Sequence, residues 1–283
     1  MSVKVGRRVP IALVAALLLA LPAAGGAGQR GDTIVQFGWV HSHPLDDNAP
    51  PRNTLRDSAL FPVLGVDSAF RSDEIATDAG SADTLGLIVK HFLSDHWALN
   101  LTVGYPPTSR LRATGTVAPT GPTGLLINLD TGRPEFNPVA SARQWSPIVL
   151  LERHFGAPDA LLRPFLAAGG TFVFFTEVGF SDAFDEAVNR RFGVPLAAAA
   201  GRPGPTRLDV ALDPVLAPVV AGGLGFRLSE RWGLTAQLAF IPLETTATVT
   251  LDAEDGTRLG TSRTRLRFDP LVVSVLLGYR FPG

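Results

Sequence analysis

Apolar and polar residues alternate along eight segments of the chain. In residues 97–105 the larger side chains Trp97, Leu99, Leu101, Val103 and Tyr105 alternate with Ala98, Asn100, Thr102 and Gly104. A period of two places the two sets on opposite faces of a β-strand. The same count predicts further strands at 33–41, 84–93, 145–155, 163–176, about 218–228, 232–243 and 266–281. The pattern therefore predicts an all-β protein.

The connections between these strands alternate in length. Short connections at 94–96, 156–162 and 229–231 alternate with long ones at about 42–83, 106–144, 177–213 and 244–265, which are rich in Gly, Pro, Asp and Ser. Short periplasmic turns and longer external loops are typical of an up-and-down transmembrane β-barrel. In the third long loop we expect one or two helical turns at 184–191 and a flexible tract at 195–206. Nothing in the long loops predicts a second domain.

The N-terminal residues have the pattern of a secretory signal peptide. Lys4, Arg7 and Arg8 precede an apolar stretch at 9–21, and small residues follow at 25–27. An N-terminal membrane anchor is the alternative. We expect a signal peptide at 1–27 and a barrel domain at 28–283, because no later apolar run reaches the roughly 18 residues of a membrane helix.

Composition removes several classes of function. The chain has no cysteine, which excludes disulfides, thiolate metal sites and a cysteine nucleophile. Its net charge of −1 gives no electrostatic case for a nucleic-acid partner. A cysteine-free, exported, apolar chain without a helical span fits a barrel in the outer membrane of a Gram-negative bacterium.

The aromatic residues of the eight strands predict two girdles at the membrane interfaces. Assigning the aromatic-rich face to lipid places two groups at opposite ends of the strands. The turn-end group is Trp97, Phe155, Phe226, Trp232, Tyr279 and Phe281, and the loop-end group is Trp39, Tyr105, Trp145, Phe174 and Phe240. The alternative is that these rings form the core of a soluble sandwich.

The opposite faces of the strands then predict a lumen in two parts. Apolar residues fill the upper part, and charged residues lie at the periplasmic end. The apolar set is Ile88, Ile148, Leu150, Val173, Phe175, Ile241, Leu243, Val272 and Leu276; the charged floor is Lys90, Glu152, Arg163, Arg227 and Arg280. We expect Glu152 to be bridged to some of these cations, because a buried carboxylate needs paired geometry. His154 is expected in the same polar floor. A purely structural polar core is the alternative.

The chain ends on an apolar strand with two aromatic residues two positions apart. Tyr279 and Phe281 resemble the C-terminal signal by which the outer-membrane assembly machinery selects barrels, although Pro282 and Gly283 follow here.

Several segments resemble the OmpW family of small outer-membrane barrels. They are GDTIVQFGWVHSHP, WALNLTVGYPPTSRLRATG, LLRPFLAAGGTFVFF, RWGLTAQLAFIPLETTATV and RLRFDPLVVSVLLGYRF, the last two being the most specific. The resemblance implies an eight-stranded barrel that takes up small hydrophobic molecules. The first and third loops look longer than is usual in the family.

The sequence leaves three interpretations of function. The first is a narrow channel for hydrophobic solutes with release sideways into the membrane lipid. The second is a structural or receptor-like surface protein that acts through its loops, and the third is a soluble sandwich or lipocalin-like binder. We expect no enzymatic activity and no cofactor. A metal at His41 and His43 with Asp46, or calcium at 252–256, is only weakly indicated.

Overall fold

The computed structural model describes residues 28–45, 50–56, 68–72, 74–118 and 128–283 of the chain. The expected signal peptide at 1–27 lies outside these residues. No helix within the described ranges is long and apolar enough to cross a membrane.

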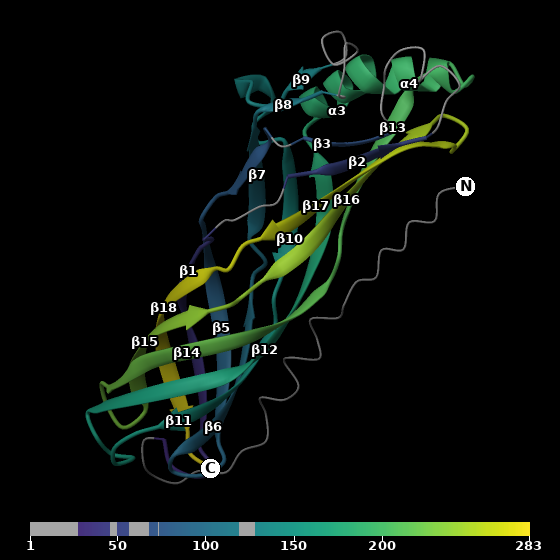
Figure 1. Ribbon diagram of the computed structural model, residues 1–283. Coiled ribbons are helices and arrows are strands. Elements are labelled where there is room, and N and C mark those ends of the chain that lie inside the picture. The colour runs from purple at the N-terminus through teal and green to yellow at the C-terminus, as the bar shows by residue number, and fades with distance from the viewer. Residues whose placement is uncertain (1–27, 46–49, 57–67, 73, 119–127) are drawn as a thin grey trace.

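Eight antiparallel strands close into a barrel, the lower part of Figure 1. Their order around the wall is β11-β6-β5-β1-β18-β15-β14-β12, and pairing between β12 and β11 closes the circle. The strands are β1 (Thr33–His43), β5 (Ala82–Phe92), β6 (Trp97–Gly104), β11 (Ile148–His154), β12 (Leu162–Phe180), β14 (Val215–Arg227), β15 (Trp232–Phe240) and β18 (Leu271–Phe281). The predicted eight-stranded antiparallel barrel is confirmed.

The short turns lie at the end of the barrel that carries the C-terminus (Figure 1). Two of these turns are closed by the same hydrogen bond, from a tryptophan backbone N–H to a serine hydroxyl. The Ser94 hydroxyl accepts a hydrogen bond from Trp97 N–H at 3.1 Å, and the Ser229 hydroxyl accepts one from Trp232 N–H at 3.1 Å. A serine side chain that satisfies a nearby backbone donor is a common way to close a turn. Each turn thereby positions a tryptophan at the start of the following strand.

Two of the predicted strands are interrupted by proline. The expected strand at 145–155 breaks at Ser146-Pro147, and the one at 266–281 breaks at Phe268-Asp269-Pro270. Proline has no backbone N–H and cannot donate to a strand ladder. These breaks mark the level at which the barrel changes into a different arrangement of strands.

The long connections contain far more β-structure than the sequence predicted. Beyond the breaks, β12 pairs with β10 (Ala140–Trp145), followed by β7 (Thr108–Thr114) and β4 (Ala76–Ala79). A second sheet has the order β13-β16-β17-β2-β3. Its strands are β13 (Thr206–Leu212), β16 (Glu244–Ala253), β17 (Arg258–Arg267), β2 (Arg52–Leu55) and β3 (Ala69–Arg71). A small pair, β8 (Thr116–Val117) with β9 (Leu129–Asp130), and a 3-10 turn, η3 (Pro134–Phe136), complete this region. The sequence analysis predicted no strands in these connections, whose Gly and Pro residues lie mostly between the strands rather than within them.

Short helices cover the outer end of the molecule (Figure 1). They are α3 (Asp182–Val188), the π-helical turn η4 (Asn189–Gly193) and α4 (Val194–Ala199). The one or two helical turns expected at 184–191 are present. The flexible tract expected at 195–206 is partly wrong, because α4 occupies its first half and Ala197 is fully buried against Leu251 and Leu259. Packing on the second sheet orders this alanine-rich stretch.

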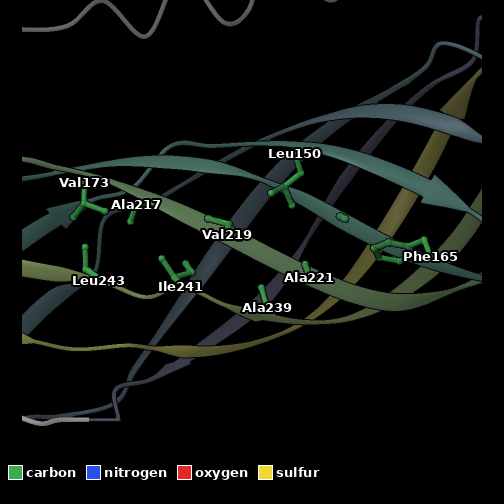
Figure 2. Close-up of a cluster of buried hydrophobic side chains, with 10 residues drawn as sticks. Leu150, Phe165, Val173, Ala217, Val219, Ala221, Ala239, Ile241 and Leu243 are labelled. Carbon is green, nitrogen blue, oxygen red and sulfur yellow. The ribbon is translucent and has the colours of Figure 1, made fainter.

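An apolar cluster fills the middle of the barrel. Figure 2 shows its side chains between the strands that carry them, β11, β12, β14 and β15 with the segment after it. The cluster contains Leu150, Phe165, Ala167, Val173, Ala217, Val219, Ala221, Ala239, Ile241 and Leu243. A barrel of about eight strands is nearly filled by its own side chains. This layer therefore separates the two ends of the lumen.

Candidate functional site: a lumen in two parts

A buried polar network closes the periplasmic side of the lumen. Glu152 on β11 is fully buried, and its Oε2 lies 2.7 Å from Lys90 Nζ on β5 and 2.8 Å from His154 Nε2. Asn100 on β6 donates to Glu152 Oε1 at 2.5 Å. Three neighbouring strands thus contribute their inward positions to one carboxylate. Every oxygen of that carboxylate has a partner, which a buried charge requires.

The arginines predicted for this floor bind other groups. Arg163 donates through Nη1 to Gly28 O at 2.9 Å and through Nη2 to Asp95 O at 2.5 Å. Arg280 Nε lies 3.8 Å from Asp32 Oδ2, and Arg227 is half-buried at the same end. Within the described chain, the cation paired with Glu152 is therefore Lys90. That these five residues form a functional plug stays a prediction.

Above the floor, several of the predicted lumen residues pack into a solid layer. Ile88, Leu150, Val173 and Leu276 are at most 2% exposed. None of the four lines either of the two cavities described below. Leu150 and Val173 belong to the cluster in Figure 2.

A cavity of about 280 Å³ begins above this layer and continues into the region outside the membrane. Of the predicted apolar set, the residues that line it are Ile148, Phe175, Ile241, Leu243 and Val272. The second sheet extends it with residues from the predicted long connections, among them Val210, Leu212 and Val249. Arg110 is the charged residue of its lining among the described residues. The two-residue alternation in 206–212 and 244–253 is the signal that would have revealed this extension.

The wall beside the cavity contains a stretch of weak strand pairing. The β6–β11 ladder ends at Thr102 opposite Ile148, and pairing resumes with Thr108 of β7 opposite Arg143 of β10. The intervening segments carry Pro106, Pro107 and Pro147. In the described chain they share one backbone hydrogen bond, from Gln144 N–H to Pro107 O at 3.1 Å. We name this stretch the proline seam. Its residues Val103, Tyr105, Pro106 and Pro107 line the cavity.

The outer face carries the aromatic residues expected to meet lipid. Trp97, Trp232 and Phe281 are 38–46% exposed at the turn end, and Trp39, Tyr105 and Trp145 are exposed at the other end. Tyr279 packs edge-on against Trp232, with ring centres 5.0 Å apart, and lies 4.9 Å from the ring of Phe281. Tyr279 and Phe281 thus belong to one aromatic group on the lipid face, while their role as an assembly signal stays a prediction.

The described residues considered for a metal site do not converge. His41 shares a hydrogen bond with Asp83 at 2.9 Å, whereas His43 pairs with Ser81 at 2.8 Å. Asp46 lies outside the described residues, and within them no three His, Asp or Glu side chains gather closely enough to hold a metal. Near the predicted calcium site, Asp252 pairs with Arg258 and Asp255 with Arg202.

Comparison with known proteins agrees with this geometry. The chain is 23% identical over 267 residues to outer membrane protein W of Vibrio cholerae serotype O1, covering 94% of this chain and 96% of that protein. The similarity to outer membrane protein W runs over nearly the whole of both chains. The family resemblance inferred from the sequence is thus confirmed, and the protein resides in the outer membrane of a Gram-negative bacterium.

Solved structures support the fold of the barrel. The crystal structure of the outer membrane protein OprG from Pseudomonas aeruginosa matches with a TM-score of 0.64 at 15% identity, covering 91% of this chain and 99% of that one. The solid-state NMR structure of outer membrane protein AlkL matches with a TM-score of 0.50 at 18% identity, covering 93% and 96%. No protein-family model matches the sequence.

Proposed function

We propose that the protein is a narrow channel for small hydrophobic molecules, which enter the upper lumen from outside and leave sideways into the membrane. The apolar cavity of about 280 Å³ carries the proposal. Apolar walls with few polar groups favour uncharged or amphiphilic ligands over hydrated ions. Ile148, Phe175 and Leu243 supply such walls directly above the packed layer.

The floor supports a sideways exit. A hydrophobic molecule that moved straight down would have to cross the packed apolar layer and then separate Glu152 from Lys90. Breaking a buried ion pair leaves uncompensated charge and is costly. The proline seam is the alternative route, because its segments share one backbone hydrogen bond and lie against both the cavity and the lipid face. Opening it requires the loss of fewer hydrogen bonds than opening any fully paired stretch of wall.

A planar bilayer recording tests the proposal. We expect small, discrete openings from the purified barrel, suppressed by a long-chain fatty acid or alkyl detergent that occupies the apolar cavity. A folded, heat-modifiable barrel that is silent in the bilayer, and that does not speed uptake of a fluorescent long-chain fatty acid into liposomes, would contradict the channel.

A surface-interaction role is the second candidate. The folded region outside the membrane supports it, because two sheets covered by α3 and α4 present a stable surface rather than loose loops. A chain in which residues 182–206 are replaced by a short Gly-Ser linker would keep solute uptake under the first proposal. It would lose the binding of a surface partner under the second.

A further inference from the structure

We infer that the periplasmic end of the barrel contains a binding site for a small organic carboxylate. The site is a second cavity, of about 90 Å³, on the opposite side of the Glu152 network from the apolar channel. Turn residues such as Pro158, Ser229 and Glu230 line its mouth, so it faces the periplasm. The inference does not rest on the proposed channel.

The cavity gathers an excess of positive charge. Lys90, Arg163, Arg227, Arg231 and Arg280 all line it, and the carboxylate in its lining is Glu230, among the described residues. Lys90 is neutralised by Glu152 at 2.7 Å, and Arg280 has Asp32 at 3.8 Å. Arg163 and Arg227 have no carboxylate within 4.0 Å in the described chain, although the charge of Asp95 acts on Arg163 at longer range. Two or more cations of the cavity therefore lack a paired anion.

Two of these guanidinium groups are buried with an unused donor. Arg163 is 7% exposed and Arg280 is 5% exposed, and the Nε of each has no hydrogen-bond partner in the described chain. A buried N–H without a partner is costly, and a charged group more so. Both side chains line the cavity, so an anion bound there would lie next to two buried guanidinium charges.

The walls indicate what kind of anion fits. Phe92, Phe165 and Leu234 line the cavity beside the cations, and Arg163 lies 5.7 Å from the ring centre of Phe92. Guanidinium groups bind planar carboxylates with two parallel hydrogen bonds. Apolar rings beside such groups favour a carboxylate that carries a small apolar body over a fully hydrated inorganic ion. We assign the site to that class, with benzoate as a suitable probe.

The test uses the full barrel in detergent micelles and fluorine NMR of 4-fluorobenzoate. We expect line broadening that unlabelled benzoate reverses, and none with 4-fluorobenzamide, which has the same shape without the charge. Arg227→Gln should weaken binding about ten-fold, as expected for the loss of a charge-assisted hydrogen bond. Arg153→Gln is the matched control, because Arg153 is an arginine of the same barrel end that lies 5.2 Å from the ring centre of Trp97 on the lipid side.

Each outcome decides the assignment. Equal broadening of the amide, equal effects of Arg227→Gln and Arg153→Gln, or no binding of benzoate at millimolar concentration would overturn the site. Displacement of 4-fluorobenzoate by inorganic phosphate at concentrations as low as those of benzoate would overturn the carboxylate class. Arg163→Gln is a second variant. Its binding of 4-fluorobenzoate is compared with that of the parent protein once its far-UV circular dichroism and heat-modifiable migration match the parent's.

Discussion

Lys90 Nζ and Glu152 Oε2 lie 2.7 Å apart, and both side chains are almost completely buried inside the barrel. The two residues come from β5 and β11, which are separated around the wall by β6. The ion pair therefore crosses a strand and links parts of the wall that share no backbone hydrogen bonds. His154 and Asn100 complete the coordination of the same carboxylate.

Replacing Glu152 with Gln should lower the stability of the barrel. The change leaves the Lys90 ammonium buried without its counter-charge, and loss of one partner of a buried pair costs about 3–5 kcal/mol. Urea unfolding in detergent micelles, followed by tryptophan fluorescence, measures the effect. An unchanged midpoint would contradict the bridge. The double variant Lys90→Met with Glu152→Leu should recover most of the loss, because it removes both charges together.

Ile148→Arg should reduce the uptake of hydrophobic solutes. Ile148 lines the apolar cavity beside the proline seam, and a guanidinium there would place a charge in the path of an apolar molecule. Ile148→Leu is the control, since it keeps the volume and the apolar character. Liposome uptake of a fluorescent fatty acid is the measurement. If both variants take up solute at the parent rate, the cavity is not the path.

Cross-linking the proline seam should block release into the membrane. Tyr105 and Trp145 are exposed on the lipid face on the two sides of the seam, and the natural chain has no cysteine to compete. The pair Tyr105→Cys with Trp145→Cys, joined by a cleavable bis-maleimide, should lose uptake and regain it on cleavage. Leu99→Cys with Leu151→Cys joins β6 to β11 where these strands are already paired, and its cross-link should have no effect. A blocked control pair would mean that the linker, not the seam, stops transport.

Arg263→Glu should stabilise the second outer sheet. Arg263 of β17 lies opposite Arg52 of β2, which lies opposite Arg71 of β3, and all three are exposed. Like charges directly opposite each other in a sheet are unfavourable, by up to about 1 kcal/mol per pair. Hydrogen exchange at residues 52–55 should slow in Arg263→Glu. Arg265→Glu should do the opposite, because Arg265 already pairs with Glu244 at 3.1 Å.

Acidification should slow amide hydrogen exchange in helix α3. Burial, and then the negative charges of Asp182 and Asp209, raise the pKa of Asp185 above its ordinary value. A carboxyl whose pKa is higher in the folded state favours folding below its unfolded pKa, and this contribution is lost as the pH rises through the folded pKa. Amide exchange in residues 182–188 should therefore be slower near pH 4, about the ordinary carboxyl pKa, than at neutral pH. The exchange rates are compared as protection factors, so that the intrinsic pH dependence of exchange cancels. Asp185→Asn should remove most of this difference; a variant with the full pH response would assign it to another group.

How far the sequence predicts the structure depends on whether a feature is local. The alternation along residues 97–105 and 232–240 is a local feature, visible within a few neighbouring residues. It correctly separated the outward side chains of Trp97 and Trp232 from the inward side chains of Asn100 and Thr235. The outer strands obey the same period, but Gly and Pro between them masked it. The outer strands were missed because Gly and Pro residues that mark the ends of strands were interpreted as parts of loops.

The sequence by itself determined that this protein is an eight-stranded outer-membrane barrel and which faces of its strands turn inward, because a period of two is set by the strand backbone alone. Only the tertiary structure decided which inward residues meet. The stagger between strands brings Glu152 to Lys90 and His154, directs Arg163 to the carbonyls of Gly28 and Asp95, and leaves the proline seam with few backbone hydrogen bonds. Those contacts depend on the register of strands far apart in the chain, and no short stretch of sequence encodes it.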